Sequence, residues 1–208
     1  MTFVNLDPPC ESPIEEHFAW GLTKHINSTA VVKTQFPVST ICGNFRLDFV
    51  LIDDKGHRVA YECDGAEFHD ASRDEWRDAM ILGGGHVDAI VRLPGAEINF
   101  RLNDSLYLAS RWDPSFFSDR GHIQLKRLAS KPAHDFDPNR NPDFAVVYYR
   151  GSEAESPGPM YLRLRRTARI VPEGKRAFWQ TAYTFASARG GNDLDETIAA
   201  YRSQRRTM

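Results

Sequence analysis

The chain has 208 residues, of which 41% are apolar, and 26 Lys and Arg stand against 28 Asp and Glu, a formal net charge of -2. This length suits one ordinary domain, or a core with an extension. No apolar run reaches the ~20 residues of a membrane helix, and 3 Cys are too few for a disulfide framework or a zinc set. The first residues lack the features of a signal peptide, so we expect reduced cysteines and a cytoplasmic protein without membrane contact.

The first predicted element is a helix that begins at Ser12. Ser12 and Glu15 form a capping box around Pro13. Apolar residues then recur at helical spacing at Ile14, Phe18, Leu22 and Ile26. A strand over residues 31–38 follows, and Pro37 places it at an edge or an end of the sheet.

Two apolar runs come next, over residues 45–52 and 59–65, and a short turn joins them as a hairpin. The first run contains Asp48, and the second contains Glu62 and Asp64. Acidic residues are poor strand formers and are costly to bury unpaired. Since residues two apart on a strand share a face, Glu62 and Asp64 point the same way. In the hairpin, Asp48 can lie across from Glu62 on that face.

These acids predict a divalent-metal site. Asp48, Glu62 and the backbone carbonyl of Cys63 supply hard oxygen ligands suited to Mg²⁺ or Mn²⁺. Such an ion polarises a phosphoryl oxygen and generates hydroxide from bound water, which is the equipment for phosphodiester hydrolysis. Glu15 adds a ligand if its helix packs beside the sheet, or only completes the capping box. Asp64 assists at the site, or is only a turn residue before a glycine.

The next predicted elements are a helix and a strand. A second capping box at residues 72–75 opens a helix with Trp76, Ala79 and Met80 on its inner face, and glycines 83–85 stop it. A strand over residues 86–93 follows, and then a short helix over residues 104–111.

The composition of residues 131–142, rich in Pro, Asp and Asn, favours an internal boundary. We therefore expect a core over residues 1–130 and an extension over residues 143–208 that packs on it. The elements predicted in the extension are strands over 144–150 and 160–171 and helices over 175–187 and 194–204.

The charge of the chain is uneven. Residues 140–208 hold 12 Lys and Arg against 7 Asp and Glu, whereas residues 1–139 hold 14 against 21. Nucleic-acid binding requires a local basic face and not a basic total. Arg163 and Arg165 alternate to one face of a predicted strand, which is either a phosphate-binding face or a solvated sheet surface.

In motif order and spacing, residues 11–95 resemble the PD-(D/E)xK nuclease superfamily, which has the restriction-endonuclease-like fold. Within that superfamily the resemblance is closest to the branch of very-short-patch repair endonucleases and the related DUF559-type proteins. The matching segments are Ser12–Glu15, Arg46–Phe49, Glu62–Gly65, His69, Arg73–Asp78 and the strand over 86–93.

This resemblance implies an α/β fold with an αβββαβ core around a central mixed sheet, plus a C-terminal α+β extension. It also implies a metal-dependent endonuclease that hydrolyses DNA. Asp48 and Glu62 then hold the metal, Glu15 and Asp64 assist, and His69 handles protons or the phosphate.

One position departs from the superfamily pattern. The superfamily places a lysine two residues after the second acid, and this chain has Asp64 there. His69 is the natural substitute as a proton shuttle or phosphate contact, and Arg73 is the next choice for stabilising charge. Arg73 and Arg77 either bind substrate phosphate or pair with neighbouring acids. The missing lysine leaves a second hypothesis open, a catalytically inactive nuclease fold that binds nucleic acid or another protein.

Overall fold

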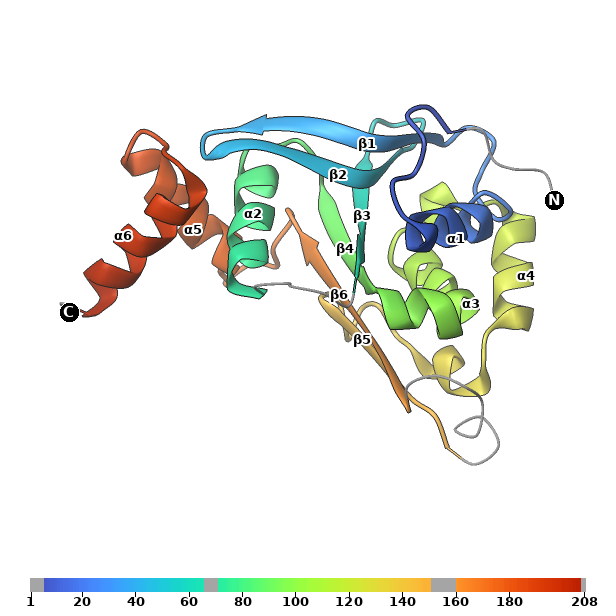
Figure 1. Ribbon diagram of the computed structural model, residues 1–208. Coiled ribbons are helices and arrows are strands. Elements are labelled where there is room, and N and C mark those ends of the chain that lie inside the picture. The colour runs from blue at the N-terminus through green and yellow to red at the C-terminus, as the bar shows by residue number, and fades with distance from the viewer. Residues whose placement is uncertain (1–5, 66–70, 151–159, 207–208) are drawn as a thin grey trace.

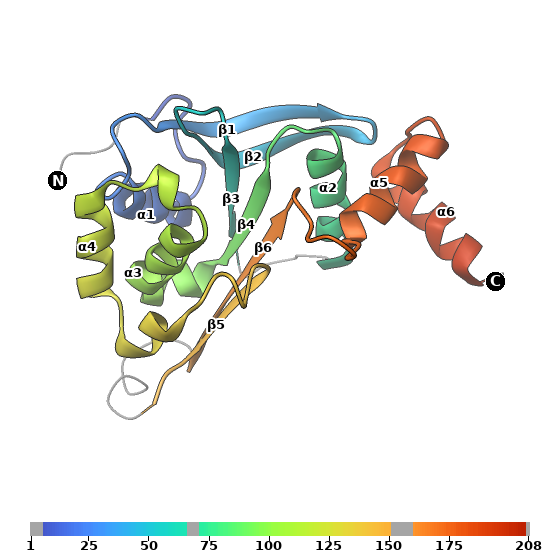
Figure 2. The same cartoon turned by 180° about the vertical axis from the view of Figure 1, so that it is seen from behind.

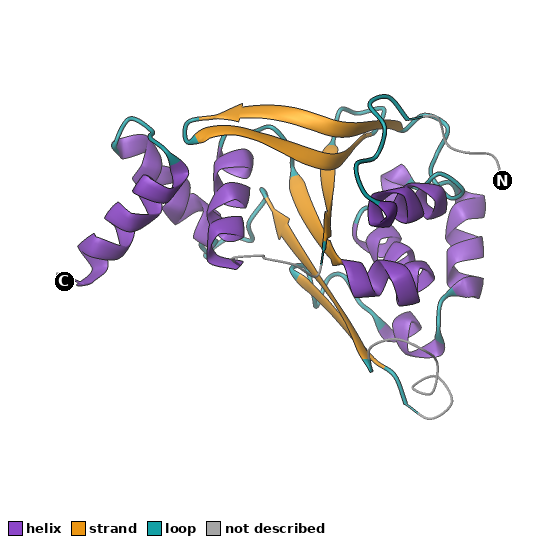
Figure 3. Cartoon of the chain, in the orientation of Figure 1, coloured by secondary structure: helices purple, strands orange, loops and turns teal. Residues whose placement is uncertain are grey.

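The computed structural model describes residues 6–65, 71–150 and 160–206. Within these ranges the chain is an α/β protein in which six α-helices surround one mixed, open, six-stranded sheet (Figures 1 and 3). No helix in the described ranges is both long and apolar enough to cross a membrane. All three cysteines lie in these ranges, and each is free.

The sheet has the order β1-β2-β3-β4-β6-β5. Its strands are β1 (Val31–Thr40), β2 (Gly43–Ile52), β3 (Arg58–Asp64), β4 (Ala89–Pro94), β5 (Phe144–Tyr148) and β6 (Tyr161–Ala168). All neighbouring pairs are antiparallel except β3 and β4, which are parallel. A parallel pair needs a crossover connection, and a helix supplies it here. Because β6 pairs with β4, the C-terminal strands extend the same sheet.

The helices are α1 (Pro13–Leu22), α2 (Ala71–Gly83), α3 (Gly95–Trp112), α4 (Asp119–Leu128), α5 (Phe178–Ala188) and α6 (Leu194–Arg206). From α1 to β4 the order is helix, three strands, helix, strand, which confirms the element order predicted for the core. Pro37 lies on β1, an edge strand, as expected from its missing N–H group.

Two apolar layers hold the helices against the sheet. On one face, α1, α3 and α4 cover a core that contains Phe18, Phe49 and Tyr61 (Figure 2). On the other face, Ile81 and Leu82 of α2 pack against β-strand residues. The helices α5 and α6 pack on α2 through an aromatic cluster around the buried Trp76. The helix α5 also reaches the sheet directly, because Trp179 Nε1 donates to the Ala168 carbonyl of β6 at 3.1 Å.

The structure corrects several of the predicted boundaries. α2 begins at Ala71, so Ser72 lies inside the helix and is not its N-cap. α1 ends at Leu22, before Ile26. The helix predicted over residues 104–111 is the second half of α3, which has a non-helical residue at Arg101. α4 was not predicted.

Candidate active site

Asp48 and Glu62 meet where β2 and β3 separate. The antiparallel ladder between these strands ends at the pair Phe49 and Tyr61. Beyond it, the Cys63 N–H donates to Asp48 Oδ2 at 2.8 Å, and the Asp48 N–H donates to Glu62 Oε1 at 3.3 Å. Carboxylate oxygens thus accept the hydrogen bonds that backbone carbonyls accept elsewhere in the ladder. The two acids predicted to share a metal ion therefore lie side by side.

The backbone opposite Asp48 explains this geometry. Gln35 of β1 has φ of +48°, the only non-glycine residue with positive φ in the described ranges, and it faces Asp48 at a gap in the β1–β2 register. Leu47 packs in the α2 layer, but Phe49, two residues later, packs in the other layer. The alternation of the strand is therefore broken at Asp48. A positive φ at such a residue is strained, and strain of this kind clusters at functional sites.

Glu62 is buried and its charge is only partly compensated. It is 3% exposed, and its Oε2 lies 2.8 Å from Nη1 of Arg77 on α2. Burial raises the pKa of Glu62 to about 7; Arg77 opposes this shift, and the neighbouring Asp48 adds to it. Burial also raises the pKa of Asp48, whose Oδ1 accepts no hydrogen bond from the described residues. The pair therefore has an excess of negative charge that a cation would relieve.

Glu15 lies near these acids, and it also completes the helix cap. Its carboxylate accepts hydrogen bonds from Ser12 Oγ at 2.8 Å and from the Glu11 N–H at 3.0 Å. A third bond, from Gln35 Nε2 at 2.6 Å, ties α1 to the strained point of β1. Glu15 also raises the pKa of Asp48. Glu15 therefore completes the helix cap and adds negative charge near Asp48.

Asp64 is engaged by a residue that the sequence analysis did not single out. Arg92 of β4 is 5% exposed and donates to Asp64 Oδ1 at 2.8 Å and to both oxygens of Asp78, at 2.7 and 3.0 Å. Asp78 also accepts from Arg165 at 3.1 Å. A chain of ion pairs therefore runs from Asp64 on β3 to Arg165 on β6.

The other predicted residues do not all lie at this site. Arg73 pairs with Asp195 of α6 at 3.0 Å. Arg77 pairs with Glu62, a partner that was not among those predicted for it. Arg163 is exposed on β6. His69 lies outside the described residues.

These residues fit a small divalent ion with few protein ligands. Within the described ranges, no group of three Asp, Glu, His or Cys side chains is arranged to hold a metal, so two of the predicted carboxylates come together and not three. Mg²⁺ is commonly held by one or two carboxylates and keeps several waters. In a strand the N–H and C=O of one residue point to the same side, so the Cys63 carbonyl faces Asp48 as its N–H does. Asp48, Glu62 and this carbonyl together make a suitable oxygen set.

No protein-family profile, no curated protein and no solved structure matches the chain. The similarity to the nuclease superfamily therefore remains a prediction from sequence motifs.

The raised pKa of Glu62 predicts that the metal-free protein loses stability as the pH rises from about 4.5 to about 7. In this range the folded chain keeps a proton that the unfolded chain has lost, so the free energy of unfolding falls, by on the order of 3 kcal/mol in total. Urea unfolding in EDTA at about pH 5 and about pH 8 measures this difference. The Glu62→Gln protein, which has no carboxyl group to titrate here, should lose most of it. An unchanged pH profile in that variant would assign the effect to other groups.

Proposed function

We propose that the protein is a metal-dependent nuclease that hydrolyses phosphodiester bonds, with DNA as the favoured substrate and a restriction-endonuclease-like core. The observation that carries this proposal is the Asp48–Glu62 pair, two buried or half-buried carboxylates placed together at a break in the sheet. Burying uncompensated carboxylates costs stability, and a site that binds a cation gives a reason for that cost.

Each residue has a role that follows from its position. Asp48 and Glu62, with the Cys63 carbonyl, hold Mg²⁺ or Mn²⁺, and the ion, when bound, polarises the phosphoryl oxygen and activates water. Glu15 adds negative charge near Asp48, and it orients Gln35 at the strained point of β1. Arg77 lies against Glu62 and is placed to contact a substrate phosphate once the ion replaces it there.

Two ion pairs favour the second candidate function, a nuclease fold that binds nucleic acid without cleaving it. Arg77 already compensates Glu62, and Asp64 stands where the superfamily has a lysine and is itself paired with Arg92. In such a module the guanidinium groups would permanently take the place of the cation.

A cleavage assay separates the two functions. Purified protein is incubated with supercoiled plasmid and with short single- and double-stranded DNA, in Mg²⁺, in Mn²⁺ and in EDTA. Cleavage that requires the metal and is lost in both Asp48→Ala and Glu62→Ala supports the nuclease. DNA binding without cleavage in any metal supports the binding module and overturns the proposal of an enzyme.

A further inference from the structure

One surface of the β5–β6 hairpin is exposed although it carries large aromatic rings. Alternate residues of the two strands, Ala145, Val147, Leu162 and Leu164, are buried in the main core. The residues between them point the other way and are exposed: Phe144, Val146, Tyr148, Tyr161 and Arg163. We call these five residues the hairpin face. Phe144, Tyr148 and Tyr161 are 43%, 67% and 52% exposed, which is unusual for rings gathered on one patch.

The chemistry of the hairpin face combines aromatic rings with a cation. The Arg163 guanidinium lies 5.4 Å from the ring centre of Phe144, and the rings of Tyr148 and Tyr161 are 6.4 Å apart. Arg163 forms no ion pair with any residue in the described part of the chain. Aromatic rings stack with unpaired bases, and an arginine among them neutralises phosphate. The face carries no acidic residue of its own, so its charge is complementary to a polyanion.

The hairpin face and the candidate active site lie on the same side of the sheet. Strand register places Glu62, Arg92, Arg165 and Phe144 in one row across β3, β4, β6 and β5. This row lies on the sheet face that α2 covers, because Arg77 of α2 reaches Glu62 and Asp78 of α2 reaches Arg92 and Arg165. Three strand spacings separate Glu62 from Phe144, a distance of about 14 Å. A nucleic acid bound to the hairpin face therefore lies on the same side of the sheet as the carboxylate pair.

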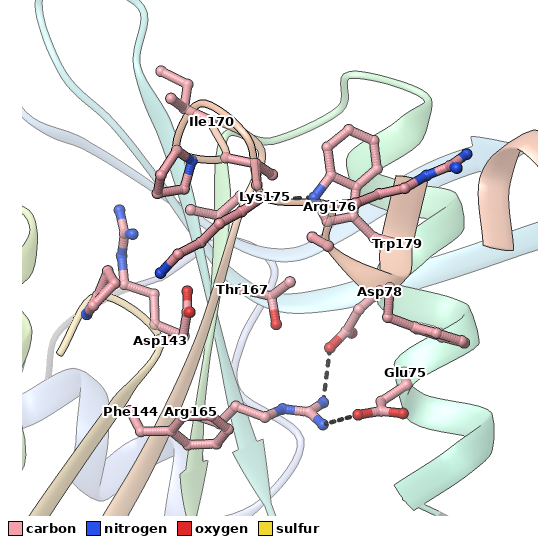
Figure 4. Close-up of a pocket in the computed structure, with 17 residues that line it drawn as sticks. Glu75, Asp78, Asp143, Phe144, Arg165, Thr167, Ile170, Lys175, Arg176 and Trp179 are labelled. Atoms are coloured by element: carbon pink, nitrogen blue, oxygen red, sulfur yellow. Dashed lines mark hydrogen bonds and ion pairs between the residues drawn. The ribbon is translucent and has the colours of Figure 1, made fainter. Parts of the chain in front are cut away.

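A pocket adjoins the hairpin face at Phe144. It has a volume of about 260 Å³, and Phe144 and Arg165 of the sheet line it together with Lys175 and Trp179 (Figure 4). The Lys175 side chain extends across the pocket toward Asp143 and forms no ion pair within the described residues. Arg165 forms ion pairs with the two α2 acids of the lining, Glu75 and Asp78. The pocket therefore adds a second cation beside the aromatic surface.

We infer that the hairpin face binds single-stranded nucleic acid. Phe144, Tyr148 and Tyr161 stack with its bases, and Arg163 and Lys175 contact its phosphates. A duplex hides the flat surfaces of its bases, whereas a single strand or an opened end exposes them to aromatic residues on a sheet. The inference rests on the proposed function in one respect, that the bound strand is the substrate. Binding itself does not require the carboxylates.

Fluorescence anisotropy in EDTA tests the inference with labelled oligo-dT, oligo-U and a duplex of equal length. We expect the single strands to bind more tightly than the duplex, and the DNA and RNA arms identify the preferred strand. Tyr161→Ala should weaken single-strand binding about tenfold or more, the effect of losing one stacked base. Arg163→Ala should lower the slope of log affinity against log salt concentration by about 0.7, the effect of one phosphate contact on a single strand.

Matched controls lie on the opposite side of the sheet. Phe100 of α3 is 50% exposed and Arg120 of α4 is exposed, so Phe100→Ala and Arg120→Ala should bind strands as the native chain does. Thermal melts of all variants establish that each is folded. Equal binding by Tyr161→Ala, Arg163→Ala and the native chain overturns the inference, and so does the absence of single-strand binding. A dimer that Tyr161→Ala dissociates, without strand binding, assigns the face to a second copy of the chain and also overturns it.

The same assay separates this inference from the proposed catalysis. Glu62→Gln should retain single-strand binding, since the Glu62 side chain is buried and lies about 14 Å from Phe144 of the hairpin face. If no metal supports cleavage but single-strand binding still depends on Tyr161, the inference about the hairpin face is supported and the catalytic proposal is contradicted. If cleavage occurs but Tyr161→Ala and Arg163→Ala leave binding unchanged, the catalytic proposal is supported and the inference about the hairpin face is contradicted.

Discussion

A Glu62→Gln protein is expected to cleave DNA about 10³-fold more slowly than the native chain in Mn²⁺, because an ion that polarises the phosphate supplies several kcal/mol of transition-state stabilisation. Asp48→Asn should show a loss of similar size. Both replacements keep the shape of the side chain and one carbonyl oxygen. The amide oxygen introduced by Glu62→Gln can still accept from Arg77, and the one introduced by Asp48→Asn can still accept from the Cys63 N–H. The initial rate of plasmid nicking at saturating metal measures the effect.

Glu16→Gln is the matched control for these variants. Glu16 is an exposed acid on α1, beside Glu15, and its replacement should leave the cleavage rate unchanged. A cleavage rate within threefold or so of the native one in both Asp48→Asn and Glu62→Gln would remove these residues from the chemistry.

An Arg92→Ala protein should lose about 3–5 kcal/mol of unfolding free energy, the usual result of removing one partner from a buried ion pair. Asp78 is 3% exposed and receives two hydrogen bonds from Arg92, and Asp64 receives a third. Without Arg92, the Asp78 carboxylate keeps its bond from Arg165, at 3.1 Å, but loses its two bonds from Arg92. Urea unfolding followed by tryptophan fluorescence measures the loss.

Arg46→Ala is the comparison for this prediction. Arg46 pairs with Glu11 on the surface, where the side chains are 54% and 52% exposed, so its loss should cost no more than about 1 kcal/mol. If Arg92→Ala costs as little as Arg46→Ala, Arg92 does not hold β3, β4 and α2 together.

Local patterns predicted much of the core. The capping box at Ser12 marks the start of α1, and Ser12 Oγ accepts from the Glu15 N–H as expected. Alternation and turn residues located β2 and β3, and the hairpin between them predicted that Asp48 and Glu62 can lie across from each other, which in the structure is just beyond the last paired residues, Phe49 and Tyr61. The N-cap predicted at Ser72 was wrong because Ser is also tolerated within the first turn of a helix, and Ser72 lies in the first turn of α2. The helix α4 was not predicted because few of its residues face the core: only Gly121 and Leu125 are buried along it.

The residues around the carboxylate pair depend on tertiary contacts that no local pattern encodes. Gln35 lies in an ordinary strand sequence, and only the fold reveals its positive φ and its bond to Glu15. Arg92 did leave a signal, since it interrupts the otherwise apolar run of β4, just as Asp48 interrupts that of β2. The burial argument that singled out the acids applies equally to a cation. Asp78, the partner of Arg92, comes from α2, however, and this pairing requires the folded chain.

Titration of the native protein with Mn²⁺, followed by electron paramagnetic resonance, tests most directly whether Asp48 and Glu62 share an ion. We expect one bound ion per chain, with binding lost or weakened at least about tenfold in Asp48→Asn and in Glu62→Gln and retained in Glu16→Gln. A native chain that binds no Mn²⁺, or one whose binding survives both substitutions, would contradict the shared site.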